Sequence, residues 1–387
     1  MARIPGGTST GSKRPDAMYG AGTPGPSHYS TAAGCRLTTT DGTELVDFTM
    51  ALGSVAFGYA DPDVTEAVIA AARNGTIAAL PHTLEVTVAE QLQAAVPIAE
   101  QVRFLKSGAE GVAAAVRIAR THTQRSHVLA CGYFGWLDWS SDAAGVPAAT
   151  QALCTRIPFG DVDAAREAAA GVQGHLAAIV IEPVIERMAP VGWLHALREL
   201  CDDNGALFIA DEIKTGFRVH PAGAVMQQGI HPDLVVFGKA LANGYPLAAV
   251  AGRGAAMAAA QHTWISSTVA CDTTALAAAS AVLARHARED VCAQLASIGK
   301  AMRAGAERAV VASGAGDVRV EGIDQMWLLR FDGDAREAQV LANARASGVL
   351  IKRGAYNFAA LAHDGAALAA LEQALAVALR SDGAAHA

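Results

Sequence analysis

The sequence predicts an α/β protein with a mainly parallel sheet in a large domain, followed by a smaller α+β domain. The first observation is that short apolar runs alternate with longer segments whose apolar residues recur at helical spacing. Short β-rich runs separated by helices are typical of a parallel sheet with both faces covered. The second is composition: 52% of the 387 residues are hydrophobic and only 17% are charged, which indicates a large buried core and argues against disorder.

Helices and strands alternate along the expected large domain, residues 62–285. Helical spacing of apolar residues is found in the segments 64–73, 85–95, 111–121, 194–204 and 274–286. Short apolar runs that predict strands lie at 102–105, 127–130, 177–181, 206–210 and 234–237. This alternation places the parallel sheet in this domain.

The expected small domain, residues 286–387, has a different pattern. Helices are predicted at 291–312, 334–347 and 365–380, and strands at 318–320, 326–331 and 349–352. Residues 1–61 are expected to form an N-terminal arm and part of this domain. The first forty residues are rich in Gly, Ser, Thr and Pro, which predicts an irregular segment packed on another part of the protein.

Charge and cysteine content argue against several classes of protein. Thirty Lys and Arg residues against 37 Asp and Glu give a net charge of −7 without any basic run, so no nucleic-acid or membrane partner is expected. The six cysteines form no C-x-x-C pair, so neither a disulfide framework nor a zinc or other metal site is expected. The first residues contain no apolar signal segment, and no apolar run is long enough to span a membrane. We therefore expect a soluble cytoplasmic protein.

Catalytic residues of open parallel sheets gather at the carboxyl ends of the strands, and four strand ends here carry unusual residues. After the strand at 102–105, Ser107–Ala109 opens a helix whose backbone N–H groups suit an anion. An ordinary helix N-cap explains the same residues. After the strand at 127–130, Gly132–Trp136 holds aromatic rings between glycines. These rings suit either stacking on a planar ligand or packing in the core.

The other two strand ends carry charged residues. Asp211 and Glu212 directly follow the strand at 206–210, either as functional acids or as a solvated pair. An ATPase would need a G-x-x-x-x-G-K-[ST] loop after a strand, and the nearest match, residues 6–13, has Ser12 at the lysine position and follows no strand. Lys239 follows the apolar strand at 234–237. Burial would lower its pKa and suit it to imine formation, unless the side chain reaches the surface.

Together, an anion cradle, a stacking ring, a carboxylate and a buried lysine are the groups that pyridoxal 5′-phosphate (PLP) requires. The lysine forms a Schiff base with the cofactor, and the acid keeps the pyridine nitrogen protonated. The 28 residues from Asp211 to Lys239 fit two strand ends joined by one crossover. These residues therefore predict a PLP-dependent enzyme.

Several motifs resemble those of class III aminotransferases of PLP fold type I, most of all the branch similar to glutamate-1-semialdehyde 2,1-aminomutase. The most specific are D-E-x-x-T-G-F-R at residues 211–218 and Gly238-Lys239. The others are Ile4–Gly7, Asp41-Gly42, Phe57–Pro62, Ile181–Pro183 and Ala362–Asp364. The resemblance covers nearly the whole chain. It implies a large domain with a mainly parallel seven-stranded sheet and a smaller α+β domain.

The resemblance also implies roles for individual residues. Lys239 and Asp211 would be catalytic, Lys239 by binding PLP covalently and Asp211 by pairing with its ring nitrogen. The cofactor-binding residues would be Ser107, Gly108, Ala109, Tyr133, Asp211, Ile213, Lys239 and Thr268. Ser107–Ala109 would cradle the phosphate, and Tyr133 and Ile213 would cover the two ring faces. Thr268 would reach the phosphate in the partner subunit, which implies a homodimer with shared active sites, and Glu212 would support the strand end by pairing with Arg218.

Three stretches depart from the family pattern and border its substrate pocket, which puts the substrate in question. Phe134 replaces a His, Val184–Arg187 replaces a small Gly-containing stretch, and Cys271–Thr273 replaces a small residue, Asn or His, and Pro. The residues expected to contact substrate are Lys13, Arg14, Ser54, Trp136, Lys352 and Arg353. For Lys352 and Arg353, solvated charges at a strand end are an equal alternative.

The function that the resemblance implies is transfer of an amino group from an amino-acid donor to an aldehyde or keto acceptor, in a specialised biosynthetic pathway. An aminomutase, which moves the amino group within one molecule, uses the same residues and stays an alternative. An epimerase on the same fold is a third. A catalytically silent PLP-fold binding protein is a fourth, against which the presence of Lys239 and Asp211 argues.

Overall fold

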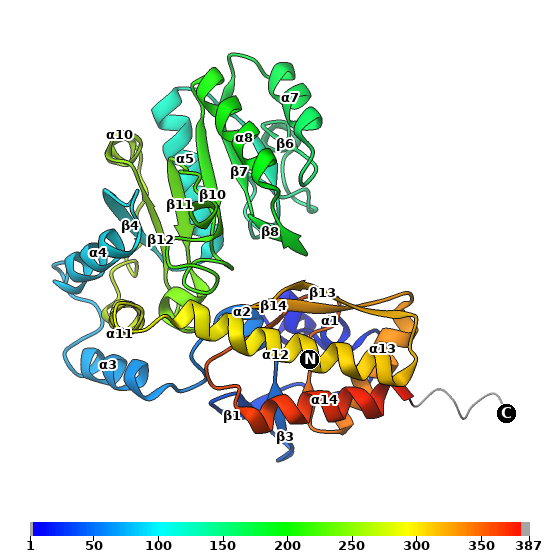
Figure 1. Ribbon diagram of the computed structural model, residues 1–387. Coiled ribbons are helices and arrows are strands. Elements are labelled where there is room, and N and C mark those ends of the chain that lie inside the picture. Colours follow the sequence, from blue (N-terminus) through cyan, green and yellow to red (C-terminus); the bar gives the residue numbers. More distant parts are fainter. Residues whose placement is uncertain (1–2, 381–387) are drawn as a thin grey trace. The chain divides into compact units, whose positions relative to one another are not determined.

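The computed structural model describes residues 3–380, which form two compact units (Figure 1). The large unit is Pro62–Cys292, and the small unit combines the chain up to Asp61 with the chain from Ala293 onward. The expected boundary at residue 285 falls at the end of helix α11 (Thr273–His286), whereas the units divide within the first turn of helix α12 (Val291–Ser313). Each unit has its own sheets.

The large unit is built on a seven-stranded, mainly parallel sheet, which confirms the expected fold class. Its strand order is β4-β12-β11-β10-β7-β5-β6. The strands are β4 (Gln101–Leu105), β5 (His127–Cys131), β6 (Cys154–Arg156), β7 (Leu176–Ile181), β10 (Leu207–Asp211), β11 (Leu234–Phe237) and β12 (Ala248–Gly252). Strand β12 pairs antiparallel with β4 and β11, and all other neighbours are parallel. The carboxyl ends of all strands except β12 therefore lie at one edge.

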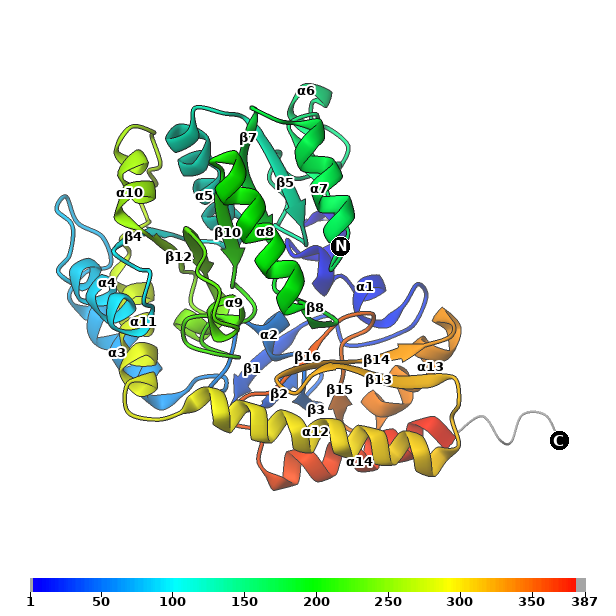
Figure 2. The same ribbon diagram turned by 45° about the horizontal axis from the view of Figure 1, so that its top comes forward.

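Helices cover both faces of this sheet, which explains why its central strands are buried at every position (Figures 1 and 2). Helix α5 (Gly108–Thr123) packs Val112 and Ile118 in one core with Ile209 and Val236. Helix α8 (Val191–Asn204) covers the opposite face, where the Arg198 guanidinium lies 5.8 Å from the centre of the Phe208 ring. Each large side chain buried in this way contributes about 1.5–3 kcal/mol to stability.

The rest of the large unit consists of short elements around the sheet. Its other helices are α3 (Pro62–Arg73), α4 (Leu84–Ala95), α6 (Ala148–Gln151), α7 (Val162–Gly171), α9 (Ala224–Gln227), α10 (Gly254–Met257) and the 3₁₀ turns η3 (Lys239–Ala242) and η4 (Ala258–Gln261). A two-stranded hairpin joins β8 (Val184–Ile185) to β9 (Arg187–Met188). The sequence patterns missed β6 and β12. Strand β12 is mostly Ala and Gly, which have low strand propensity.

The small unit contains two sheets, in which all neighbouring strands except β3 and β15 are antiparallel, and three longer helices, α12, α13 and α14. One sheet has the order β1-β2-β3-β15 and the other β13-β14-β16. Their strands are β1 (Tyr29–Ala33), β2 (Arg36–Thr39), β3 (Glu44–Asp47), β13 (Val318–Ile323), β14 (Met326–Phe331), β15 (Val349–Leu350) and β16 (Asn357–Phe358). The helices are α1 (Pro15–Tyr19), α2 (Met50–Gly53), α13 (Asp334–Ala346) and α14 (Gly365–Arg380), with 3₁₀ turns η1 (Pro5–Gly7) and η2 (Gly11–Lys13). The expectation of a wholly irregular first segment was wrong, because β1 and β2 pair as a hairpin there.

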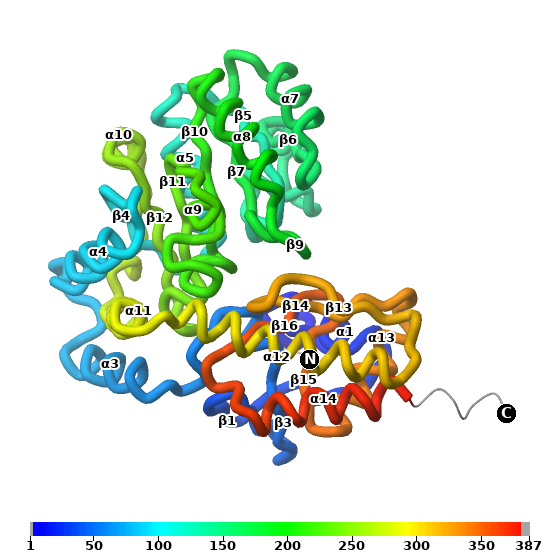
Figure 3. The backbone as a smooth tube through the Cα atoms, viewed as in Figure 1, coloured from blue at the N-terminus to red at the C-terminus, as the bar shows by residue number. Residues whose placement is uncertain are grey.

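Within the small unit, α12 and α14 run side by side in both ribbon views and in the backbone trace (Figures 1, 2 and 3). A two-pronged ion pair joins them, with Arg308 Nε 2.9 Å and Nη2 2.5 Å from the carboxylate of Glu372. Over residues 3–380, no helix combines the length and the apolar character that crossing a bilayer requires.

Candidate active site

Polar or aromatic residues follow five parallel strands of the large unit at the edge where these strands end. The residues are Lys106 and Ser107 after β4, Tyr133 after β5, Glu182 after β7, Asp211 as the last residue of β10, and Lys239 after β11. Strands β10 and β11 are direct neighbours, with Asp211 in register with Val236. The topology thus brings together side chains that lie far apart in the sequence, as expected for a site at the carboxyl edge of a parallel sheet.

Lys239 carries an amine whose proton is held weakly. Its backbone has φ of +48°, a strained left-handed conformation for a residue with a side chain, and the side chain is half-buried. Within residues 3–380, its Nζ makes no hydrogen bond or ion pair. Burial, and then the neighbouring Lys214 cation, lower the pKa of Lys239 to about 8, while Glu182 and Asp211 act in the opposite direction. The amine is therefore partly neutral, and so nucleophilic, near neutral pH.

Asp211 is a buried carboxyl that makes no ion pair within the described residues 3–380. Only 4% of the residue is exposed, and its Oδ1 accepts a hydrogen bond from the Ile213 N–H at 3.0 Å. Its Oδ2 accepts no hydrogen bond from the described part of the chain. Burial, and then the nearby Glu182 carboxylate, raise the pKa of Asp211 well above its ordinary value. Such a carboxyl gains most from a ligand that brings a positive N–H group, because that group offsets the cost of burying the charge.

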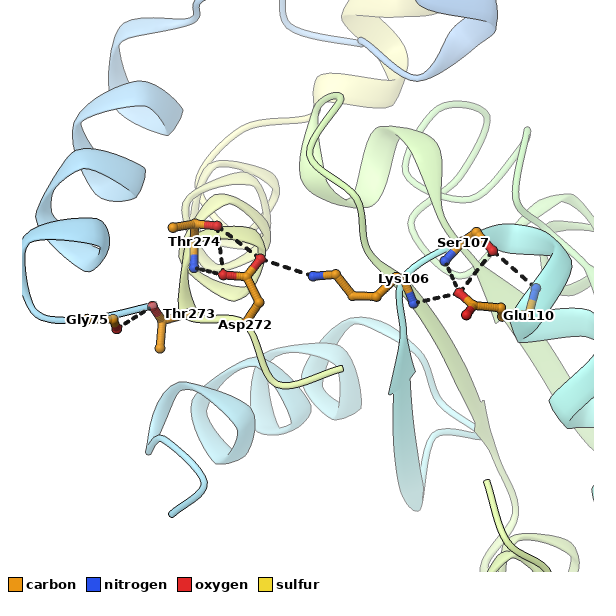
Figure 4. A network of polar contacts seen from close by, with 7 residues as sticks. All are labelled: Gly75, Lys106, Ser107, Glu110, Asp272, Thr273 and Thr274. Atoms are coloured by element: carbon orange, nitrogen blue, oxygen red, sulfur yellow. Dashed lines mark hydrogen bonds and ion pairs between the residues drawn. The ribbon is translucent and has the colours of Figure 1, made fainter. Parts of the chain in front are cut away.

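The expected phosphate cradle (Ser107–Ala109) lies at the N-terminus of the 16-residue helix α5 (Figure 4). Glu110 closes a capping box here: its Oε2 accepts from the Ser107 N–H at 2.8 Å, and Ser107 Oγ accepts from the Glu110 N–H at 3.3 Å. The N–H groups of Gly108 and Ala109 have no acceptor among residues 3–380. They point from a helix N-terminus whose dipole favours an anion. The structure thus shows the ordinary N-cap, and the two N–H groups next to it fit the expected anion cradle.

Glycines let neighbouring loops approach this cradle closely. A Cβ on Gly108 would lie 2.6 Å from Cδ1 of Ile213, and one on Gly238 would lie 3.5 Å from the same side chain. Ile213 therefore packs between the cradle and the backbone that carries Lys239. On the other side, a Cβ on Gly135, at φ of +90°, would lie 2.4 Å from the Cβ of Ala109, so the loop that carries Tyr133 also packs on the cradle.

An ion pair ties the cradle to the start of helix α11 (Figure 4). Lys106 extends away from Ser107, and its Nζ lies 3.1 Å from Oδ2 of Asp272. Asp272 is also the N-cap of α11, where its Oδ1 accepts from the Thr274 N–H at 3.1 Å. Burial opposes ionisation, but hydrogen bonds from Thr274 and Lys106 hold the pKa of Asp272 below its ordinary value. Thr268 lies exposed in the turn just before this N-cap.

Two residues that the sequence patterns did not single out as part of the site, Glu182 and Lys214, lie beside it. Glu182 is 6% exposed, and its Oε1 lies 2.8 Å from Lys214 Nζ. Its Oε2 accepts a hydrogen bond from the Tyr133 N–H at 2.9 Å. For Glu182, the sequence signal was its place in the motif Ile181–Pro183, where an acid directly follows a buried strand. For Lys214, the signal was its place three residues after Asp211. Neither pattern specifies that these two side chains meet.

The expected support of the strand end by Glu212 takes a different form. Its carboxylate accepts hydrogen bonds from the Thr215 hydroxyl and from the N–H groups of Ala224 and Val225, the latter two at 2.7 and 2.8 Å. The pairing with Arg218 was therefore the wrong expectation: among the described residues, Arg218 is not one of these donors. Arg218 is fully buried, which lowers its pKa to about 10.

The expected substrate residues fall in two places. Trp136 lies in the large unit and is 76% exposed, and Tyr133 in the same loop is 74% exposed. Phe134, between them, is buried and packs against Trp139 with ring centres 5.4 Å apart. In the small unit, Lys13 lines a cavity of about 170 Å³ together with Ala51 and Leu52.

The other expected substrate residues of the small unit do not line this cavity. Arg14 is exposed, and Ser54 is half-buried beside the turn α2. Lys352 is buried and donates to the Ala17 carbonyl at 3.1 Å, and Arg353 pairs with Glu337 at 3.4 Å. Lys352 and Arg353 thus bind other parts of the small unit, and the alternative of a solvated charge is wrong for the buried Lys352.

The residues at the carboxyl edge fit PLP. Within residues 3–380, the N–H groups of Gly108 and Ala109 have no acceptor and suit a phosphate, and the Oδ2 of Asp211 has no donor and suits a protonated ring nitrogen. The Lys239 amine suits an aldehyde. Ile213 packs against the cradle, and Tyr133 lies exposed in the loop that also packs on it.

Comparison with known proteins agrees with this fit. A family model described as aminotransferase class-III matches residues 20–140 and 142–362. Glutamate-1-semialdehyde 2,1-aminomutase of Roseiflexus castenholzii is 32% identical to this chain, over 98% of this chain and 94% of the relative. The enzyme of the same name from Myxococcus xanthus is 34% identical, over 79% of this chain and 75% of the relative.

Solved structures show the same fold. The FumI protein of Sphingopyxis sp. MTA144, solved in a PLP form, superposes with a TM-score of 0.92 at 26% identity, over 98% of this chain and 94% of that one. A transaminase solved with PLP bound superposes with a TM-score of 0.90 at 27% identity, over 98% of this chain and 95% of that one. These matches show that the chain belongs to the class III aminotransferases and is a PLP-dependent transaminase or aminomutase.

Proposed function

We propose that this protein is an aminotransferase that moves an amino group from an amino-acid donor to an aldehyde or keto acceptor, in a specialised biosynthetic pathway. The observation that carries the chemistry is the pair at the carboxyl ends of the adjacent strands β10 and β11: a buried Asp211 and a Lys239 amine with a pKa near 8. The amine is poised to move protons, and the carboxyl is poised to hold one on a bound base.

Each residue of the site has a proposed task. When bound, PLP supplies an electron-poor ring that stabilises negative charge on the substrate carbon next to nitrogen. The N–H groups of Gly108 and Ala109 would hold the phosphate, and Tyr133 and Ile213 would orient the ring from its two faces. Asp211 would keep a proton on the ring nitrogen. Lys239 Nζ would act as the general base that removes the proton from the substrate carbon next to nitrogen, and then as the general acid that donates this proton to the carbon on the other side of that nitrogen.

A homodimer with shared active sites is part of the proposal. Thr268 lies exposed beside apolar side chains that water disfavours, Trp264 at 85% and Val269 at 45% exposure. A second copy covering this surface would bury them and would bring Thr268 to the phosphate of the partner subunit. This arrangement supports a site that is complete only in the dimer.

The aminomutase alternative is favoured by the names of the two relatives at 32% and 34% identity. Against it stands the unusual construction of the stretch after Pro183: Glu186 at the tip of the hairpin β8–β9 has φ of +59°, and Arg187 lies over the ring of Phe159 at 5.3 Å. This stretch and the Cys271–Thr273 stretch support a substrate different from that of the relatives. The arginine that the family uses for the substrate carboxylate falls at Lys13 or Arg14; Lys13 in that place would give a point charge rather than the two-pronged contact of Arg.

The test is an absorbance spectrum of the PLP-loaded protein before and after addition of single amino acids without an acceptor. A transaminase loses the PLP band and releases one equivalent of keto acid, which names its donor. A PLP band that no common amino acid bleaches favours the aminomutase or a donor specific to one pathway. A protein that binds no PLP would refute the proposal and favour a silent binding protein. Lys239→Ala is the control: it should retain PLP without a covalent bond and show no turnover.

A further inference from the structure

Glu182 joins three loops at the carboxyl edge of the large sheet. Its backbone N–H donates to the Cys131 carbonyl at 2.9 Å, at the end of β5. Its side chain accepts from the Tyr133 N–H at 2.9 Å and meets Lys214 Nζ at 2.8 Å. The loops after β5, β7 and β10 therefore converge on one carboxylate.

The residues around the Glu182 carboxylate supply a counter-ion and the space that its side chain needs. The side chains of Glu182 and Lys214 are only 8% and 16% exposed, so each depends on the other to offset the loss of water. Lys214 Nζ also lies 3.4 Å from the Val184 carbonyl, to which it donates. Gly132 has φ of +130°, and a Cβ there would lie 2.6 Å from Cγ of Glu182, so only glycine leaves room for this side chain.

The pair lies among the charges that act on the two catalytic residues. The charged groups that influence Lys239 are Lys214, Glu182, Asp211 and Arg218. Lys214 lowers the pKa of Lys239 and Glu182 raises it, so the intact pair adds little net charge to the site. Glu182 also raises the pKa of Asp211, whereas Lys214 lowers it.

We propose that Lys214 is a positioning residue of the active site: through its ion pair with Glu182, it fixes the backbone at Tyr133 next to the strand ends that carry Asp211 and Lys239. The inference rests on the proposed roles of Lys239 and Tyr133 at PLP. Loss of the Lys214 cation leaves a buried carboxylate without its counter-ion. That carboxylate then repels Asp211, favours the protonated form of Lys239 and loosens its hold on the Tyr133 loop.

The experiment compares wild type with Lys214→Met, Glu182→Gln, the double variant and Lys214→Arg. The first readout is the pH midpoint for the rate at which PLP attaches covalently to the apoprotein, which reports the Lys239 amine. We expect Lys214→Met to raise this midpoint by about 0.5–1 pH unit and Glu182→Gln to lower it by a similar amount. The double variant should return close to wild type. Lys300→Met, which removes an exposed lysine from α12, is the charge-matched control and should change nothing.

The second readout is the dissociation constant for pyridoxamine 5′-phosphate, which needs no reaction with Lys239. Lys214→Met should weaken it about tenfold, and Lys214→Arg should restore it. Midpoint shifts of the same sign in both single variants, or an unchanged dissociation constant in Lys214→Met, would overturn the inference. Wild type without a midpoint near pH 8 would instead overturn the proposed role of Lys239, so the two failures are distinguishable.

Discussion

The lowered pKa of Lys239 predicts how fast the apoprotein captures PLP at different pH values. Only the neutral amine attacks the aldehyde, and burial together with the Lys214 cation brings the pKa from 10.5 to about 8. The neutral fraction at pH 7 is then about one tenth, which is about 300 times that of an ordinary lysine. It rises to about nine tenths at pH 9. The rate of covalent attachment should therefore increase about tenfold from pH 7 to pH 9 and level off above.

The assay is stopped-flow absorbance of apoprotein mixed with excess PLP between pH 6 and pH 10. Pyridoxamine 5′-phosphate, which carries an amine in place of the aldehyde, serves as the reference. It reports how pH affects the cradle and the phosphate, so the ratio of the two rates isolates the amine. A ratio that keeps rising tenfold per pH unit up to pH 10 would show an ordinary amine at position 239 and refute the reasoning.

Three further predictions concern residues that would hold the cofactor. Asp211→Asn, which keeps the shape of the side chain but removes its charge, should lower the rate of the half-reaction by about a hundredfold to a thousandfold, measured by single-turnover absorbance. Thr268→Ala should weaken PLP retention, yet mixing it with Lys239→Ala should regenerate one intact site per mixed dimer, measured as recovered covalent PLP. Lys106→Ala breaks the half-buried pair with Asp272 and should weaken PLP binding about fivefold, a loss of about 1 kcal/mol, measured by equilibrium titration of the apoprotein.

Each of these has an outcome that contradicts it. A loss of less than tenfold in Asp211→Asn would show that the carboxylate does not hold the ring nitrogen. Recovery of no covalent PLP in the mixed sample, when chromatography shows mixed dimers, would place Thr268 outside the partner's site. For Lys106→Ala, an unchanged dissociation constant with a lowered melting temperature would assign the ion pair to stability alone.

The strand ends show which parts of the site the sequence patterns predict. Apolar runs end at Leu105, Cys131 and Phe237, and the residues that follow each run are unusual enough to predict a cofactor. Because carboxyl ends of parallel strands share an edge, these segments are expected to meet even though no local pattern links them. Strand β12 escaped prediction because its residues are mostly Ala and Gly. Its antiparallel pairing with β4 and β11 supplies the strand character that its sequence lacks.

The sequence by itself determined the fold class and the identity of the PLP-dependent family, because periodic apolar runs and the residues at strand ends are local properties of the chain. Only the tertiary structure decided which charges face one another. The Lys214–Glu182 and Lys106–Asp272 pairs join residues 32 and 166 positions apart, and Glu212 takes Thr215 and two backbone N–H groups as donors in place of Arg218. Such pairings depend on Å-scale distances between separate loops. Burial, and then the nearby charges of Lys214 and Glu182, shift the pKa of Lys239 in the same way, through tertiary packing.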